Sequence, residues 1–179
     1  AGGTVTLSAS VADPESQPMS VTFYGRLKSP PVGPDFTLVT LPDTQFYSEN
    51  TGGTRLQHFL SQTNWIVANR NTLNIPFVAH MGDMVQNGDS VVQEWINADS
   101  AMDIIEDPAT TLLTHGIPWG GAPGNHDQPP IGSPDGASLY WNTYFGTARW
   151  AGRPYWGGNY STNNDNNYQL FSASGLDFI

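Results

Sequence analysis

The chain lacks cysteine altogether and is poor in positive charge. Without cysteine, neither a disulfide framework nor a thiolate metal site is possible. Six Lys and Arg residues stand against sixteen Asp and Glu, for a formal net charge of -10 at pH 7. A chain with this balance repels phosphate backbones at long range, so we do not expect general nucleic-acid binding. Nor does any apolar run approach the roughly 18 residues that a membrane-spanning helix needs, so no membrane span is expected.

Apolar side chains are nevertheless plentiful enough for a folded core. Hydrophobic residues make up 38% and aromatic residues 12% of the 179 positions, which favours a folded domain over disorder. Charged residues make up only 12%, about half the usual fraction. The abundance of Gly, Asn, Ser and Thr with little Lys is typical of exported bacterial proteins. We therefore expect an extracellular or cell-surface location.

The first 28 residues differ in pattern from the rest. Residues 4–11 and 19–24 alternate apolar and polar side chains, as half-buried strands do, and an acidic turn joins them. Two strands alone bury too little surface to fold. They are either the C-terminal strands of an immunoglobulin-like or cadherin-like module or a plain hairpin that packs on the main domain. The Pro-rich stretch 29–34 predicts a stiff linker, and the main domain is expected to span residues 35–179.

Residues 35–179 alternate between strand and helix patterns, which predicts an α/β domain. We expect strands at 35–41, 75–80, 116–119, 168–171 and 176–179, and helices at 53–70 and 90–106. Ser90 is the expected N-cap of the second helix, whose inward side chains are Val92, Trp95, Ile96, Met102 and Ile105. Residues 128–167 are rich in Pro, Gly and Asn and are expected to be mostly loop.

Three short polar motifs follow the first three predicted strands. They are Pro42-Asp43-Thr44-Gln45, Gly82-Asp83-Met84-Val85-Gln86-Asn87 and Gly124-Asn125-His126-Asp127. Neighbouring strands lie about 4.8 Å apart, so residues at the same end of such strands can converge. An α/β enzyme gathers its site at one edge of a sheet in this way.

Oxygen donors dominate the motifs. The carboxylates of Asp43 and Asp83 would repel each other at close range unless a divalent cation lay between them. Gln45 and Asn125 offer neutral oxygens as further ligands. His80 lies inside an apolar run and is expected to be packed or hydrogen-bonded. His58 and His115 are expected on the surface.

Taken together, these motifs resemble those of calcineurin-like metallophosphoesterases. The family pattern is Asp-x-His, Gly-Asp-x-x-Asp/Asn, Gly-Asn-His-Asp/Glu, a single His and then Gly-His-x-His. Residues 124–127 match in full, and Asp43 and Gly82-Asp83 also match. Gln45 and Gln86 stand where the family has His and an acid or Asn. These variants resemble an exported bacterial branch. The resemblance covers residues 35–179 and implies the N-terminal part of a β-sandwich flanked by helices.

The resemblance implies metal-dependent hydrolysis of a small phosphomonoester or phosphodiester. Asp43 and Gln45 would bind the first of two divalent metal ions, Asp83 would bridge both, and Asn125 would bind the second. His126 would protonate or hydrogen-bond the leaving group, oriented by Asp127. A water that bridges the metals would attack phosphorus. The Gln45 oxygen slightly favours Mn or Mg, without distinguishing them from Fe or Zn.

The last two family motifs are missing, because no histidine follows His126. A half-built site should bind metal weakly, so this chain alone is expected to be an inactive or weakly active fragment. A partner chain or a missing C-terminal half would complete the site. The alternative is a non-catalytic module of an exported or cell-surface protein, with a structural role or a glycan or protein ligand.

Aromatic residues gather after the third motif, and they allow two interpretations. They would either cap the metal site and stack on a nucleoside, sugar or aryl group, or pin a long loop to the sheet. We prefer the second interpretation. The residues are Tyr140, Trp141, Tyr144, Phe145, Trp150, Tyr155, Trp156 and Tyr160.

Overall fold

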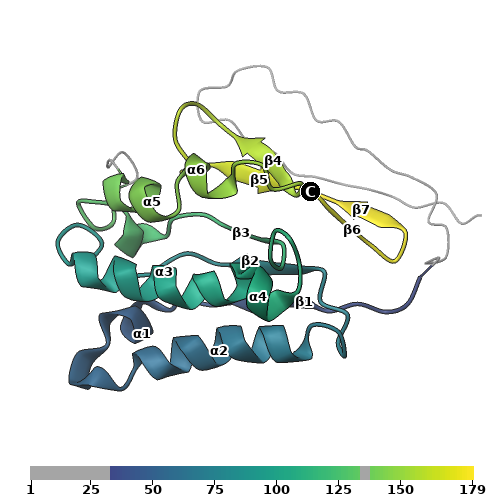
Figure 1. Cartoon of the computed structure of the whole chain (residues 1–179). Coiled ribbons are helices and arrows are strands. Elements are labelled where there is room, and N and C mark those ends of the chain that lie inside the picture. Colours follow the sequence, from purple (N-terminus) through teal and green to yellow (C-terminus); the bar gives the residue numbers. More distant parts are fainter. Residues whose placement is uncertain (1–32, 134–137) are drawn as a thin grey trace, which may run out of the picture. The chain divides into compact units, whose positions relative to one another are not determined.

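The structure is a computed structural model that describes residues 33–133 and 138–179 (Figure 1). The expected hairpin in residues 1–28 and most of the linker lie outside the described residues, so the predicted domain boundary stays a prediction. The described residues form a mixed α/β arrangement of helices and small sheets. This confirms the α/β class, while the immunoglobulin-like module and the complete sandwich remain predictions.

A parallel three-stranded sheet lies at the centre. Its strands are β1 (Leu38–Leu41), β2 (Phe77–His80) and β3 (Trp119–Gly121), in that spatial order. Parallel neighbours need long crossovers, and here each crossover is helical. The first contains α1 (Gln45–Glu49), the 3₁₀ turn η1 (Thr51–Gly53) and α2 (Leu56–Asn69). The second contains α3 (Val92–Glu106) and α4 (Pro108–Thr111).

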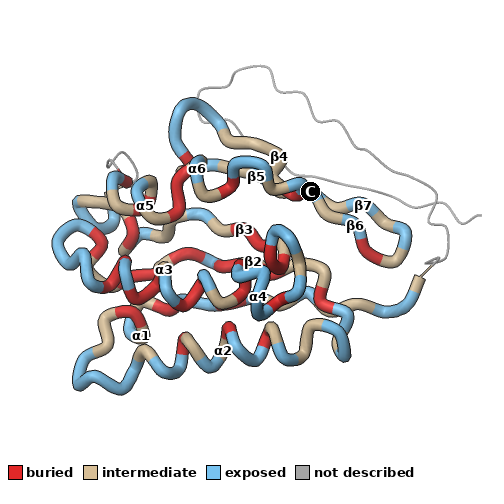
Figure 2. Tube along the Cα trace, viewed as in Figure 1, coloured by how far each residue is buried: buried red, intermediate tan, exposed pale blue. Residues whose placement is uncertain are grey.

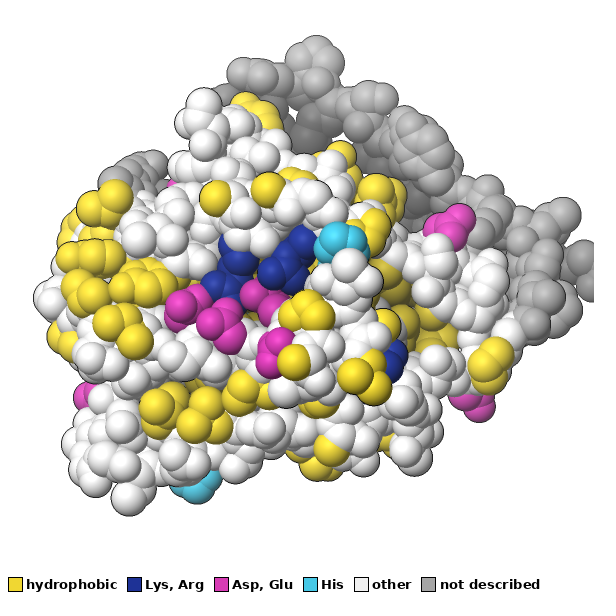
Figure 3. Space-filling view, in the orientation of Figure 1, with side chains coloured by type: hydrophobic (Ala, Val, Ile, Leu, Met, Phe, Trp, Pro, Cys, Tyr) yellow, Lys and Arg dark blue, Asp and Glu magenta, His cyan; other side chains and the backbone are white. Residues whose placement is uncertain are grey.

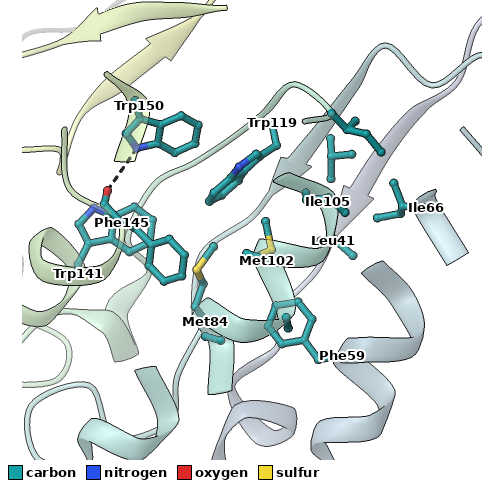
Figure 4. Close-up of a cluster of buried hydrophobic side chains, with 14 of the residues drawn as sticks. Leu41, Phe59, Ile66, Met84, Met102, Ile105, Trp119, Trp141, Phe145 and Trp150 are labelled. Carbon is teal, nitrogen blue, oxygen red and sulfur yellow. Dashed lines mark hydrogen bonds between the residues drawn. The ribbon is translucent and has the colours of Figure 1, made fainter. Parts of the chain in front are cut away.

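The main core lies between this sheet and the helices. Leu41 and Val78 from the sheet join apolar side chains of α2 and α3 in one buried cluster. Figure 4 shows Leu41 close to Ile66 and Ile105, with Phe59 and Met102 beside them. Buried segments run along the facing sides of the sheet and helices in Figure 2. When successive crossovers in a parallel sheet have the same hand, their helices lie on the same face of the sheet. The packing of α2 and α3 into one core agrees with this rule.

Two antiparallel hairpins cover the opposite face. They pair β4 (Trp156–Asn159) with β5 (Asn167–Gln169), and β6 (Phe171–Ala173) with β7 (Leu176–Phe178). Phe171 stacks on Phe77 of β2, with ring centroids 4.5 Å apart. Phe77 and Val78 point to opposite faces of a strand, so this contact lies on the side away from the helices. The strands expected near the C-terminal end therefore form separate two-stranded sheets.

The aromatic segment is partly helical and mostly buried. It contains α5 (Leu139–Tyr144) and α6 (Thr147–Trp150), where mostly loop was expected. Trp141, Phe145 and Trp150 have no exposed surface, and the Trp150 indole donates to the Phe145 carbonyl at 3.4 Å (Figure 4). Burial of this kind supports the pinning interpretation. Tyr160 is the exception, with 79% of its surface exposed.

An ion-pair cluster fastens α6 to α3. Arg149 pairs with Asp99, with Asp103 at 2.6 Å and with Glu106 at 2.8 Å. The guanidinium also lies 4.9 Å from the Phe145 ring centroid, within cation–π range. Figure 3 shows dark-blue and magenta side chains gathered on this face.

The second crossover helix, α3, differs from its prediction in where it begins and in which side chains face the core. The N-cap of α3 is Val91 and not Ser90, because the helix begins at Val92. The Val91 side chain makes no capping hydrogen bond. Val92 and Ile96 are 39% and 41% exposed instead of inward, whereas Trp95, Met102 and Ile105 are buried. The helix is turned so that Glu94, Ala98, Ala101 and Ile105 face inward. No helix in the described part of the chain is long and apolar enough to cross a membrane.

Candidate functional site

The three motifs meet at one edge of the parallel sheet, as their positions predict. Leu41, His80 and Gly121 are register partners across the last rung of β1, β2 and β3. Each strand leaves the sheet there and enters its motif loop within a few residues. The Met81 N–H continues the pairing to the Leu41 carbonyl at 3.0 Å. The loops therefore start side by side.

His80 joins the first motif to the second. Its Nδ1 accepts from the Gly82 N–H at 3.2 Å, which leaves Nε2 as the donor to Thr44 Oγ1 at 3.1 Å. The Thr44 hydroxyl donates onward to the Met84 carbonyl at 3.3 Å, and the Thr44 N–H donates to the Asp83 carbonyl at 3.1 Å. Burial lowers the pKa of His80 to about 3. The expectation of a packed, hydrogen-bonded histidine is confirmed.

Asp83 joins the second motif to the third. Its Oδ1 accepts the backbone N–H of His126 at 2.9 Å. The residue has a φ of 48°, a left-handed conformation that Asp tolerates better than most residues and that often marks a functional site. A Cβ on Gly124 would overlap Asp83 Oδ1, so only glycine allows this approach.

The imidazole of His126 is oriented by a carbonyl and not by the carboxylate of Asp127 that we expected. Its Nδ1 lies 2.9 Å from the Gln86 carbonyl oxygen, which can only accept. Nδ1 is therefore the protonated nitrogen, and Nε2 is the nitrogen through which any proton reaches a substrate. The ring is partly exposed, as a group that acts on a bound molecule has to be.

Asp127 points inward and crosslinks two loops. It has no exposed surface, and its carboxylate accepts N–H groups from Met84 at 3.2 Å, Val85 at 3.1 Å and Gly124 at 2.9 Å. Burial raises the pKa of Asp127 to about 7, and these three bonds oppose that shift. Its role in the structure is to hold the second and third motifs together. Sequence reasoning missed this, because a backbone N–H partner leaves no mark in the sequence.

The predicted metal ligands follow strand ends at the same edge of the sheet, and they differ in exposure. Asp43 and Asn125 are exposed, while Asp83 and Gln45 are partly buried. Within residues 33–133 and 138–179, no group of three or more His, Cys, Asp or Glu side chains is placed to hold a metal ion. Gln45 and Asn125 carry amide side chains and do not belong to these four residue types.

One observation fits a missing cation. The Gln45 Oε1 atom is buried and accepts no hydrogen bond from the described part of the chain. A buried acceptor without a partner is costly, so it calls for a ligand, a water or an ion. An amide oxygen, like the carboxylates of Asp43 and Asp83 at the same sheet edge, is a donor of the kind that Mg²⁺ and Mn²⁺ prefer.

A groove of about 470 Å³ borders the first motif on the outer side of β1. Its lining includes Leu41, Pro42, Tyr47 and Trp65, and it lies between β1 and α2. It does not include Asp83 or His126. The groove is therefore separate from the contact that joins the second and third motifs.

Comparison with known proteins gives relatedness without an activity. The uncharacterized protein YvnB of Bacillus subtilis (strain 168) is 36% identical to this chain over 151 residues. The match covers 84% of this chain and 10% of YvnB, so the chain spans about a tenth of the length of that relative. No protein-family model and no solved structure matches the chain.

Proposed function

We propose that this chain contributes the first part of a metal-dependent phosphoesterase site. The observation that carries the proposal is the meeting of the three motifs at one sheet edge, where the carboxylate of Asp83 holds the backbone of His126. The match to the metallophosphoesterase motifs and the unpartnered Gln45 oxygen support it. A small phosphate ester as substrate, divalent metal ions and an extracellular or cell-surface location belong to the same proposal.

Each residue has a role that its chemistry allows. Asp43, Gln45, Asp83 and Asn125 would hold divalent cations, which would supply Lewis acidity and an activated water. Because the Nδ1 of His126 is held by the Gln86 carbonyl, Nε2 is the nitrogen that would take up a proton and pass it to the leaving-group oxygen. His80 and Asp127 fix the loops that carry these groups. Rigid support of this kind keeps a site in working geometry.

The test is hydrolysis of an aryl phosphodiester with Mn²⁺, together with Mn²⁺ binding measured by calorimetry. We expect weak binding and slow turnover, because four oxygen ligands hold a cation loosely. His126→Ala should abolish turnover but leave Mn²⁺ binding in place. Asp83→Asn should reduce both.

Matched controls come from exposed residues of the same types. His115→Ala and Asp89→Asn alter an exposed histidine and an exposed acid outside the predicted ligand set, and both should behave as the wild type. The proposal fails if the chain binds no Mn²⁺, or if the Asp83→Asn and His126→Ala variants hydrolyse the ester as fast as the wild type. The alternative, a non-catalytic binding module of an exported protein, would then be preferred.

A further inference from the structure

Glu94 is a buried carboxylate that the proposed chemistry does not use. It lies in the first turn of α3, and only 3% of its surface is exposed. Its Oε2 accepts the backbone N–H groups of Gln86 at 2.7 Å and Asn87 at 2.8 Å. Its Oε1 accepts from the Asn87 side chain at 2.8 Å. A buried carboxylate is stabilised by several donors, and all three here belong to one turn of the second motif.

The same turn holds the imidazole of His126. The Gln86 carbonyl, which accepts from His126 Nδ1, and the Asn87 N–H, which donates to Glu94, belong to one peptide group. A peptide group is planar and trans, so its C=O and N–H point in opposite directions. Glu94 therefore fixes the direction of the Gln86 carbonyl. If this peptide rotated, the bond to Glu94 and the bond to His126 would be lost together.

The electrostatics act in the same direction as the geometry. A carboxylate that accepts from the N–H side of a peptide polarises it and makes its carbonyl a stronger acceptor. Close packing leaves the turn little room to adjust, because a Cβ on Gly88 would overlap the His126 carbonyl oxygen. The turn and the third motif are thus in direct contact.

We propose that Glu94 is a positioning residue for His126, acting through the Gln86–Asn87 peptide group. It selects the tautomer of His126 with Nδ1 protonated and so presents the bare Nε2 at the site. The consequence for catalysis rests on the proposed function, whereas the choice of tautomer does not. The two can therefore fail separately.

The experiment is long-range ¹H–¹⁵N NMR of the imidazole rings, without metal or substrate. The chain has four histidines, and a His126→Gln variant assigns the signals of interest. In the wild type, His126 should show a protonated Nδ1. His80, whose Nδ1 accepts from Gly82, should show the opposite tautomer and serves as an internal reference.

The decisive variant is Glu94→Gln, which keeps the shape of the side chain but turns one acceptor into a donor. We expect the ratio of Nδ1–H to Nε2–H tautomer at His126 to fall about three- to tenfold, the effect of one weakened hydrogen bond. His80 should not change. The matched control is Asp89→Asn, which removes an exposed carboxylate from the same loop and should leave His126 unaltered.

Two results would overturn the inference. One is a wild-type His126 protonated at Nε2. The other is a Glu94→Gln spectrum in which the amides of Gln86 and Asn87 move while the His126 ring stays as it was. If Glu94→Gln does not fold, Glu94→Asp, which is too short to reach both backbone amides, is judged by the same criteria. Absence of Mn²⁺ binding with an intact tautomer would count against the proposed function alone.

Discussion

Acidification should destabilise this protein through one buried side chain, His80. The imidazole is nearly inaccessible to solvent, and burial lowers its pKa from 6.5 to about 3. Both ring nitrogens are already engaged, Nδ1 by the Gly82 N–H and Nε2 by the Thr44 hydroxyl. A proton on Nδ1 would break the first of these bonds. The folded state therefore resists protonation that the unfolded state accepts.

The sign and the size follow from proton linkage. Between pH 6.5 and pH 3 the unfolded chain carries a proton on this residue and the folded chain does not, so stability falls as the pH falls. Each pH unit in that window costs about 1.4 kcal/mol. Going from pH 7 to pH 5 should therefore cost about 2 kcal/mol, a sizeable share of the roughly 5–15 kcal/mol that stabilises a typical domain.

The perturbation is His80→Gln, whose amide can still donate to Thr44 but does not titrate. Urea unfolding at pH 7 and at pH 5 gives the stability of each protein, followed by the fluorescence of buried Trp95, Trp119, Trp141 and Trp150. The quantity of interest is the difference between wild type and variant. Other titrating groups, Asp127 among them, contribute about equally to both and cancel.

We expect the unfolding free energy of the wild type, relative to that of His80→Gln, to fall by about 2 kcal/mol between pH 7 and pH 5. Stability curves that run parallel across this range would refute the reasoning. They would mean that His80 titrates in the folded protein much as it does in the unfolded chain. A His80 ring signal that shifts near pH 6.5 in the folded state would say the same.

Two further substitutions test the remaining supports of the fold and the site. Asp127→Ala should cost about 2–4 kcal/mol of unfolding free energy at pH 8, because three backbone N–H groups lose their buried acceptor, and amide exchange at Met84 and Val85 should speed up. A wild-type urea midpoint would contradict the crosslink. Arg149→Lys should cost about 2 kcal/mol, since a single ammonium cannot replace a planar guanidinium that pairs with Asp99, Asp103 and Glu106. An unchanged melting temperature would show that these ion pairs contribute nothing net.

The parts of the fold that the sequence predicts are those governed by local pattern and chain direction. Alternating strand and helix patterns predict the order from β1 to β3. Parallel strands necessarily bring Asp43, Asp83 and Asn125 to one edge. The boundaries shift by a few residues, as at β3, where pairing extends to Gly121. The C-terminal strands pair with each other, and tertiary contacts such as the stacking of Phe171 on Phe77 and the bond from the Asn167 side chain to the Gly121 carbonyl reveal where they lie.

The roles of Asp127 and Glu94 depend on partners that a sequence does not display. Asp127 binds amides more than forty positions before it, at Met84 and Val85, and the position of the His126 ring depends on a carbonyl. Glu94 did leave one trace. It falls on the same helical stripe as Ala98 and Ile105, and an acid on an apolar stripe indicates a buried partner.

In the three loops at the sheet edge, some positions are fixed by close backbone packing and others can be substituted. Gly82 and Gly124 abut each other so closely that neither accommodates a side chain, and Asp127 ties both loops through their main chain. Insertions there would disturb all three loops together. The side chains of Gln45 and Asn125 are not tied in this way, so single replacements at these two positions can test the proposed metal ligation while the backbone stays as it is.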